Sequence, residues 1–312
     1  MSETKLNRRQ LLKGVGALGA AAILPEITKA ETASKLSPFV FSLNMSTIRG
    51  HKLGFVKELE TASKAGFRSV EIWMDSFQTY LSKGGTVSDA KKRVNDLGLK
   101  IENCIGFAKW IVDDEGTRNE GLEQMKKEMN LLAELGCKRT AAPPMGATDT
   151  EPIELKRVAE RYRAILELGE QTGVTPQLEM WGFSKNLSKV SEVLFVAAES
   201  SHPSSKLLLD VYHIYKGDSS LDSLPLVGKA GLEIFHVNDY PAQIKPAKIA
   251  DTDRIYPGDG AAPISKILKA LKKDDKPLII SFEVFNENYY KQDPLKVAQT
   301  ALLKMRAVTQ NI

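Results

Sequence analysis

The sequence has few cysteines, no long apolar run and no large excess of charge of one sign. Its 312 residues include only two cysteines, Cys104 and Cys137, so a disulfide framework cannot hold the fold together. The predicted elements place these cysteines near opposite ends of neighbouring strands, and we expect both thiols to be free. No stretch approaches the roughly 20 apolar residues of a membrane-spanning helix. The net charge of +4 is too small to indicate nucleic-acid binding.

The small excess of positive charge is concentrated near the N-terminus. Residues 1–30 contain five Lys or Arg and two Glu, which leaves a net charge of +1 for the rest of the chain. The run NRRQLLK at residues 7–13 resembles a twin-arginine motif, and an apolar run and a small-x-small site follow it. We predict a signal peptide over 1–30, a linker over 31–37 and export to a bacterial periplasm. An uncleaved N-terminal helix is the alternative.

Strand-like and helix-like segments alternate through residues 38–312 without a break in composition. The predicted strands are Phe39–Ser46, Ser69–Met74, Lys100–Phe107, Arg139–Met145, Thr175–Trp181, Lys206–Tyr212, Leu232–Asp239 and Pro277–Phe285. The predicted helices cover 53–65, 86–97, 119–135, 153–172, 188–200, 221–229, 263–273 and 294–309. Eight such units predict an α/β fold, a (β/α)8 TIM barrel in a single domain. A doubly wound sheet would need a glycine-rich turn after its first strand, and residues 41–47 (FSLNMST) contain no glycine.

The four late strands each carry a side chain that can bind a metal, after a run of apolar residues. These side chains are Glu179, Asp210, His236 and Glu283. The carboxyl ends of barrel strands meet at one mouth, and buried carboxylates need partners there. A single bound divalent cation would satisfy all four groups. Three oxygen donors and one imidazole favour manganese, magnesium or cobalt, with zinc as the alternative.

The same segments carry a family resemblance over essentially all of residues 38–312. The sequence resembles the xylose-isomerase-like barrel superfamily in the Glu179 strand, in the DVYH run at 210–213, in the HVNDYP run at 236–241, in the DRIYPGDG run at 253–260, and in Glu283 on the last strand. In ketose 3-epimerases of this family the matching Glu, Asp, His and Glu bind one metal, and the histidine that matches His213 contacts the substrate. Members are often dimers or tetramers, so the resemblance is compatible with a homo-oligomer, but the sequence itself does not indicate the oligomeric state.

Two departures from the family limit which of its activities the resemblance implies. Endonucleases of the superfamily have histidines on the second and third strands, and here those strands contain none. This argues against a nuclease and against a nucleic-acid partner. The arginine that contacts substrate in some 3-epimerases is replaced by Ala242, so the substrate half of the site differs from theirs.

The residues therefore predict a metal-dependent epimerase or isomerase that acts on a keto sugar through an enediolate. Glu179 and Glu283 are the predicted proton acceptor and donor, and His213 is predicted to hydrogen-bond the reacting oxygen. A lyase or dehydratase that acts on a keto-sugar, a keto-glycoside or an inosose begins with the same proton abstraction and stays open. A non-catalytic carbohydrate-binding barrel is the third alternative.

Further side chains near the strand ends are candidates for contacts with a carbohydrate. Aromatic faces suit the apolar faces of sugar rings, although core or rim packing is the alternative for each tryptophan, and a structural ion pair is the alternative for Glu71. The candidates are Glu71, Trp73, Trp110, Trp181, Asn238, Asp239 and Phe285. An exported enzyme without a glycine-rich phosphate turn is expected to take an unphosphorylated sugar.

Overall fold

The computed structural model describes residues 37–272 and 275–312. The predicted signal peptide and all but the last residue of the predicted linker lie outside the described residues. Cys104 and Cys137 are both buried and free, as predicted. Among the described residues, no helix has both the length and the apolar character that crossing a bilayer requires.

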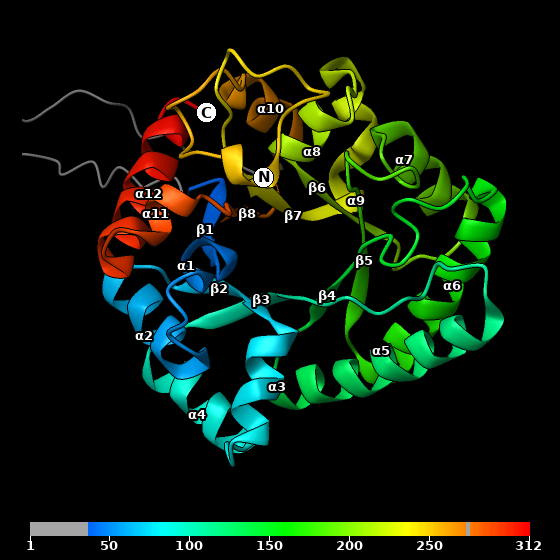
Figure 1. The fold of residues 1–312 in the computed structure, drawn as a ribbon, viewed down its shortest axis with the longest axis horizontal. Coiled ribbons are helices and arrows are strands. Elements are labelled where there is room, and N and C mark those ends of the chain that lie inside the picture. Colours follow the sequence, from blue (N-terminus) through cyan, green and yellow to red (C-terminus); the bar gives the residue numbers. More distant parts are fainter. Residues whose placement is uncertain (1–36, 273–274) are drawn as a thin grey trace, which may run out of the picture. The chain divides into compact units, whose positions relative to one another are not determined.

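Eight parallel strands form the centre of the described part of the chain, and helices surround them (Figure 1). The strands are β1 (Phe39–Asn44), β2 (Ser69–Trp73), β3 (Lys100–Ile105), β4 (Arg139–Ala142), β5 (Thr175–Glu179), β6 (Lys206–Asp210), β7 (Leu232–Val237) and β8 (Leu278–Phe282). Their order is β3-β2-β1-β8-β7-β6-β5-β4. Strands β3 and β4, at the two ends of this order, are joined by a hydrogen bond of 3.2 Å from the Thr140 hydroxyl to the Cys104 carbonyl. The sheet is therefore a nearly closed barrel, and the predicted fold class is confirmed.

The helices follow the strands in the expected alternation. They are α1 (Ser46–Arg49), α2 (Phe55–Ala65), α3 (Met74–Ser82), α4 (Val87–Asp96), α5 (Glu115–Leu135), α6 (Leu155–Thr172), α7 (Val190–Glu199), α8 (Val211–Lys216), the 3₁₀ helix η1 (Leu221–Val227), α9 (Gly228–Gly231), the 3₁₀ helix η2 (Asp251–Asp253), α10 (Ile264–Leu271), α11 (Glu287–Tyr290) and α12 (Pro294–Thr309). The long helix α5 illustrates the local signals. The Asp114 carboxylate accepts the Thr117 N–H at its start, and Gly136, with φ 95°, ends it in the left-handed conformation.

Two differences from the predicted elements have local causes. The segment expected as a helix over 221–229 begins as the 3₁₀ helix η1, which contains Pro225, a residue with no N–H to donate. The sixth strand was expected to reach Tyr212 but ends at Asp210. The Asp210 carboxylate accepts the His213 N–H at 3.1 Å, which starts helix α8 at once. This early helix start places His213 on a helix beside the barrel mouth.

Candidate functional site

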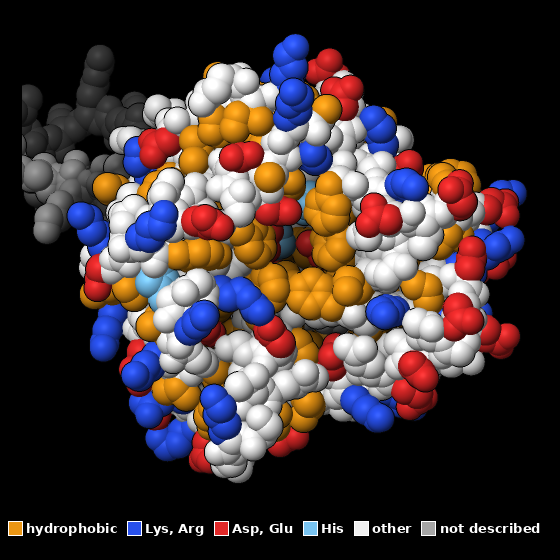
Figure 2. All heavy atoms as spheres, viewed as in Figure 1, with side chains coloured by type: hydrophobic (Ala, Val, Ile, Leu, Met, Phe, Trp, Pro, Cys, Tyr) orange, Lys and Arg blue, Asp and Glu red, His pale blue; other side chains and the backbone are white. Residues whose placement is uncertain are grey.

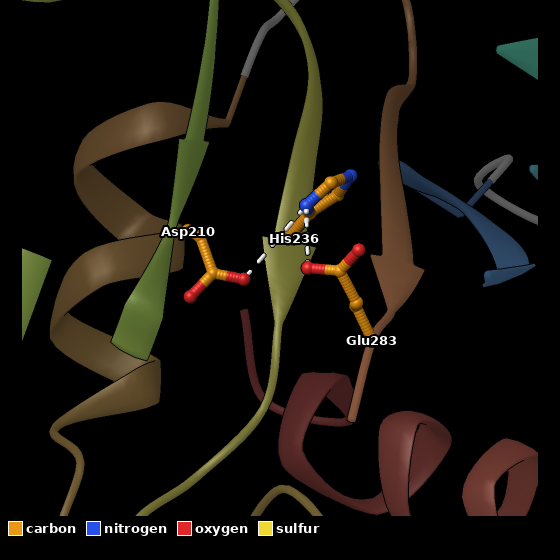
Figure 3. A group of neighbouring side chains, drawn as sticks. All are labelled: Asp210, His236 and Glu283. Atoms are coloured by element: carbon orange, nitrogen blue, oxygen red, sulfur yellow. Dashed lines mark ion pairs between the residues drawn. The ribbon is translucent and has the colours of Figure 1, made fainter. Parts of the chain in front are cut away.

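Three metal-capable side chains converge where strands β6, β7 and β8 end (Figure 3). Asp210 is the last residue of β6 and pairs in register with His236 of β7, while Glu283 directly follows β8. One donor atom from each of the three lies within 4.8 Å of the others, and all three side chains are buried. The fold thus brings together three of the predicted ligands, which are up to 73 positions apart in the chain.

The distances within this cluster suit a cation between the three groups. The Nδ1 atom of His236 lies 3.2 Å from a Glu283 carboxylate oxygen and 3.8 Å from an Asp210 oxygen, yet it makes no hydrogen bond. A nitrogen lone pair facing two carboxylates is repulsive unless a proton or a cation lies between them. Two oxygen donors and one imidazole are ligands that a divalent metal accepts, so these residues fit one.

Glu71 on β2 fixes the orientation of the His236 ring from the other side. A Glu71 carboxylate oxygen lies 3.0 Å from His236 Nε2, which leaves Nδ1 facing the cluster. Glu71 is fully buried and accepts hydrogen bonds from Asn44 at 3.2 Å and Asn103 at 2.9 Å. Burial acts against a charged imidazole, but the carboxylates of Glu71 and Glu283 raise the pKa of His236 well above its ordinary value. Glu71, predicted as a substrate contact, therefore lies behind a candidate metal ligand.

A buried arginine completes the charged cluster from the loop after β7. Arg254, only 1% exposed, donates to Glu283 at 2.8 Å and to Asp210 at 3.2 Å. Its other terminal nitrogen lies 3.3 Å from His213 Nε2, and its guanidinium lies 4.2 Å from the centre of the Tyr212 ring. Burial and the positive charge of Arg254 hold the pKa of His213 well below its ordinary value. His213 is therefore neutral at the edge of the site.

Glu179, at the end of β5, lines the same cavity as Glu283 but is not among the three clustered residues. One of its carboxylate oxygens is buried and has no hydrogen-bond partner. Burial and the nearby Glu283 carboxylate raise the pKa of Glu179 to about 8. In contrast, although burial opposes it, His236 and Arg254 hold the pKa of Glu283 far below its ordinary value. Two carboxyl groups in one cavity thus have pKa values pushed in opposite directions.

The cavity in front of these groups has a volume of about 240 Å³ and aromatic walls. The ring centres of Trp73 and Phe107 lie 5.3 Å apart, and those of Trp73 and Phe285 lie 5.9 Å apart. Trp181 and Phe183 complete the wall. Figure 2 shows hydrophobic side chains gathered around a hollow at the centre of this face. The predicted contacts Trp73, Trp181 and Phe285 therefore lie together at the cavity, and Phe107 and Phe183 join them.

Three other predicted substrate contacts lie away from this cavity. Trp110 is fully buried, donates to the Pro143 carbonyl at 2.8 Å and packs in the core. Asn238 donates to Asp210 at 2.9 Å and supports that carboxylate from behind. Asp239 accepts backbone N–H groups from Gly258, Gly260 and Ala262 at 2.8–3.0 Å. These hydrogen bonds hold the loop after β7 in place, and they account for the burial of the Asp239 carboxylate.

The site also contains polar residues that the sequence analysis did not select. Asn44 ends β1, donates to Glu283 at 2.9 Å and accepts a hydrogen bond from the Trp73 indole, also at 2.9 Å. Asn103 on β3 bonds Glu71 and in turn accepts from Gln177 on β5 at 3.3 Å. Asn44 could have been found by the rule used for the late strands, a polar residue after an apolar run. Arg254 could not, because a long loop delivers it.

Comparisons with known proteins agree with this architecture. Residues 59–308 match the family described as xylose isomerase-like TIM barrel, and residues 5–25 match the twin-arginine translocation signal sequence. An inosose isomerase from Bacillus velezensis is 25% identical over 257 residues, which cover 81% of this chain and 91% of that protein. A 3-dehydro-D-guloside 4-epimerase from Escherichia coli is 22% identical over 70% of this chain and 84% of its own length.

Comparison with solved structures indicates the same fold. The crystal structure of the IOLI protein, described with a bound zinc atom, superposes with a TM-score of 0.79 at 24% identity, over 86% of this chain and 98% of that one. At this identity the likeness concerns the fold. The family match covers most of the chain, from the second helix to the last, and its fold is the one described above. The chain belongs to the xylose isomerase-like TIM barrel family.

Proposed function

We propose that this protein is a metal-dependent epimerase or isomerase that moves the proton next to the carbonyl of a keto sugar. The observation that carries the proposal is the pair of carboxyl groups in the aromatic cavity. Glu179 and Glu283 both line this cavity beside the candidate metal cluster, and in the metal-free protein the pKa of Glu179 is raised to about 8 while that of Glu283 is lowered. Two titratable groups whose pKa values are pushed apart in one cavity serve as an acid and a base. The relatives described as isomerases and epimerases support the same class of reaction.

Asp210, His236 and Glu283 would hold the metal, with Glu179 as the predicted fourth ligand. When bound, a divalent ion supplies positive charge beside the sugar carbonyl and lowers the energy of the enediolate by several kcal/mol. Manganese, magnesium or cobalt remains our first choice from the ligand set, with zinc as the alternative. The zinc atom named for the IOLI protein supports a divalent ion in this fold.

The side chains of this chain have separate tasks in the proposed reaction. Glu283 and Glu179 take and return the proton on the two sides of the sugar ring. Neutral His213 hydrogen-bonds the reacting oxygen. Arg254 keeps Asp210 and Glu283 in place through its two hydrogen bonds. The aromatic walls hold the ring and exclude water, which strengthens every charge interaction inside the cavity.

An unphosphorylated substrate fits the charges that line the cavity. Glu179, Asp251 and Glu283 face it, and the one lining cation, Arg254, is already paired with carboxylates. Among the described residues that line the cavity, no lysine or arginine is therefore left to pair with a phosphate group. The twin-arginine signal indicates export through that pathway, and we propose the periplasm as the place where the enzyme acts.

The test is exchange of the sugar's α-proton with deuterated solvent in the presence of Mn²⁺. We expect wild type to exchange deuterium into a keto sugar and Glu179→Gln to lose this exchange by about 10²- to 10⁴-fold. Glu199→Gln, an exposed carboxylate on α7, is the matched control and should exchange normally. Full exchange by Glu179→Gln would overturn the assignment of Glu179.

A lyase or dehydratase is the second candidate, because it begins with the same proton abstraction. A structure described as a probable 3-DHS dehydratase shares the fold, with a TM-score of 0.69 at 18% identity. The mass of the product separates the two reactions, since epimerisation conserves mass and elimination does not. A protein that binds the sugar without exchange or turnover would instead be a carbohydrate-binding barrel.

A further inference from the structure

A second, larger cavity adjoins the proposed catalytic cavity on the side of β1, β2 and β8. Its volume is about 970 Å³, against about 240 Å³ for the catalytic cavity. Pockets for drug-sized ligands span about 300 to 1,000 Å³, so the smaller cavity suits a single sugar ring and the larger one suits further substituents. We call the larger one the α2–α3 groove; its lining includes Leu53, Val56, Thr79, Tyr80, Phe285 and Tyr290.

The groove and the catalytic cavity are adjacent, and three observations mark the boundary between them. Phe285 lines both. Asp251 of η2 faces the catalytic cavity, and its neighbour Thr252 faces the groove. Arg49, which lines the groove, lies 4.3 Å from the centre of the Trp73 ring, which lines the catalytic cavity. A substituent on a ligand in the catalytic cavity would reach the groove by crossing this boundary at Phe285.

Two tyrosines form groove walls, and each lies flat against a glycine. A Cβ at Gly85 would come within 2.3 Å of the Tyr80 ring, and a Cβ at Gly50 would come within 2.2 Å of the Tyr290 ring. The Tyr290 hydroxyl also donates to the Ser46 carbonyl at 2.8 Å, and Tyr80 packs on Phe55 at 5.3 Å between ring centres. These contacts hold two aromatic walls in fixed positions, a property of a preformed binding surface.

The groove has no net preference for an anion. Arg49 is paired with Asp75 at 2.5 Å. Glu58 and Glu287 line the same groove as three lysines, Lys52, Lys57 and Lys83. An apolar floor with nearly balanced charges at the rim suits a neutral ring, because the ring's faces stack on aromatic groups while its hydroxyls meet polar ones.

We propose that the α2–α3 groove binds the aglycone of a keto-glycoside, so that the substrate is a sugar that still carries its glycosidic substituent. This inference rests on the proposed function of the catalytic cavity and adds the substrate class to it. The keto-sugar ring occupies the catalytic cavity, and the substituent crosses Phe285 into the groove. The relative described as a 3-dehydro-D-guloside 4-epimerase makes a keto-glycoside a reasonable probe.

The experiment compares 3-keto-glucosides that differ only in the aglycone: methyl, phenyl and glucosyl. With Mn²⁺ present, we expect wild type to show a kcat/KM at least tenfold higher for the phenyl or glucosyl compound than for the methyl compound. Thr79→Trp places a large ring in the groove from an exposed position on α3, and we expect it to abolish this preference. Ser82→Trp is the matched control, since Ser82 is exposed on the same helix and does not line the groove; it should keep the preference.

Equal kcat/KM for the three compounds in wild type, or an unchanged preference in a folded Thr79→Trp variant, would overturn the inference. Binding separates this failure from failure of the proposed function. Unreactive phenyl glucoside can be titrated against the intrinsic tryptophan fluorescence of the whole protein. If no compound reacts, tighter binding of phenyl than methyl glucoside in wild type, lost in Thr79→Trp, still supports the groove. Equal binding of the two contradicts it.

Discussion

The two ends of the barrel both contain buried charges, and they balance them differently. At the amino ends of the strands, Arg139 of β4 reaches Glu102 of β3 at 3.3 Å and Glu233 of β7 at 2.5 Å. Lys100 and Lys276 also approach these carboxylates, at 2.8 and 3.6 Å. Although burial acts against it, the Arg139 hydrogen bond lowers the pKa of Glu233. Each carboxylate at this end has cationic partners.

At the carboxyl ends, negative groups outnumber positive ones. Glu71, Glu179, Asp210 and Glu283 share two basic partners, Arg254 and His236. One result is a carboxyl group that keeps its proton near neutral pH, and another is an imidazole nitrogen that faces carboxylates without a hydrogen bond. In a balanced network every charge has a partner and removing one partner destabilises the fold, whereas an unbalanced network indicates a site for a further cation or a reacting proton. The comparison therefore separates a structural end from a functional end.

The largest effect is expected from a substitution at the carboxyl ends of the strands, where the charges are unbalanced. Glu283→Gln should lower kcat/KM by about 10²- to 10⁴-fold, because it removes a candidate ligand and the proposed base. After metal chelation, its thermal stability should fall below that of wild type, because the buried Arg254 and His236 lose the carboxylate whose pKa they hold low. Steady-state kinetics and calorimetry check both parts, with Glu199→Gln as the control. An unchanged kcat/KM in the folded variant would show that Glu283 is chiefly structural.

Arg139→Met should lower stability without lowering activity. It leaves the Glu102 and Glu233 carboxylates without their shared partner, and we expect a loss of about 2 kcal/mol in the free energy of unfolding. Activity per folded molecule should stay the same. Denaturant unfolding measures the loss, and Arg157→Met, which removes an exposed pair with Asp113, should cost at most about 0.5 kcal/mol. Equal losses in the two variants would refute the special role of the amino-end network.

Glu71→Gln tests the support of the proposed metal ligand His236. Loss of a carboxylate behind a metal-binding histidine typically weakens metal binding about 10- to 100-fold. Titration of Mn²⁺ by calorimetry gives the affinity. Glu102→Gln is the matched control, because Glu102 is equally buried but contacts Arg139 at the other end. If both variants weaken metal binding alike, the two ends are not independent.

The last prediction concerns a pH dependence of stability in the chelated protein. Glu179 has a folded pKa of about 8, raised from the ordinary value of 4.5. A raised carboxyl pKa means that stability is fully present below pH 4.5 and is lost as pH rises to about 8. Wild type should therefore lose stability relative to Glu179→Gln across this window, as thermal melting can measure. Parallel melting curves from pH 5 to 9 would contradict the protonated state of Glu179.

The fold and the cluster of candidate ligands could be predicted because one rule governs both. Eight alternating strand and helix patterns give a barrel, and the ends of its parallel strands must meet. Asp210, His236 and Glu283 each end an apolar run, so their positions follow from the strands. Arg254 comes from a long loop whose path has no periodic signal. Trp110 also follows a strand by several residues, and the direction of a loop side chain cannot be derived from its distance along the sequence.

The same limit applies to the amino-end network. Arg139 lies at the start of β4, where the sequence gives no sign that its side chain reaches Glu233, three strands away in the sheet. Asn44 and Asn103 could have been selected as polar residues that follow apolar residues on a strand. An amide in that position indicates a functional site less strongly than a carboxylate does. Side chains that only position other side chains are therefore the part of the site that sequence patterns predict least well.

The most direct test of the functional end is a Mn²⁺ titration of the chelator-treated full chain, with metal content measured by mass spectrometry. Wild type should bind one ion per chain, and a variant that combines Asp210→Asn with His236→Gln should bind none while remaining folded. A wild type that binds no ion but still exchanges the α-proton of a keto sugar would contradict the account, as would a double variant that binds Mn²⁺ as tightly as wild type.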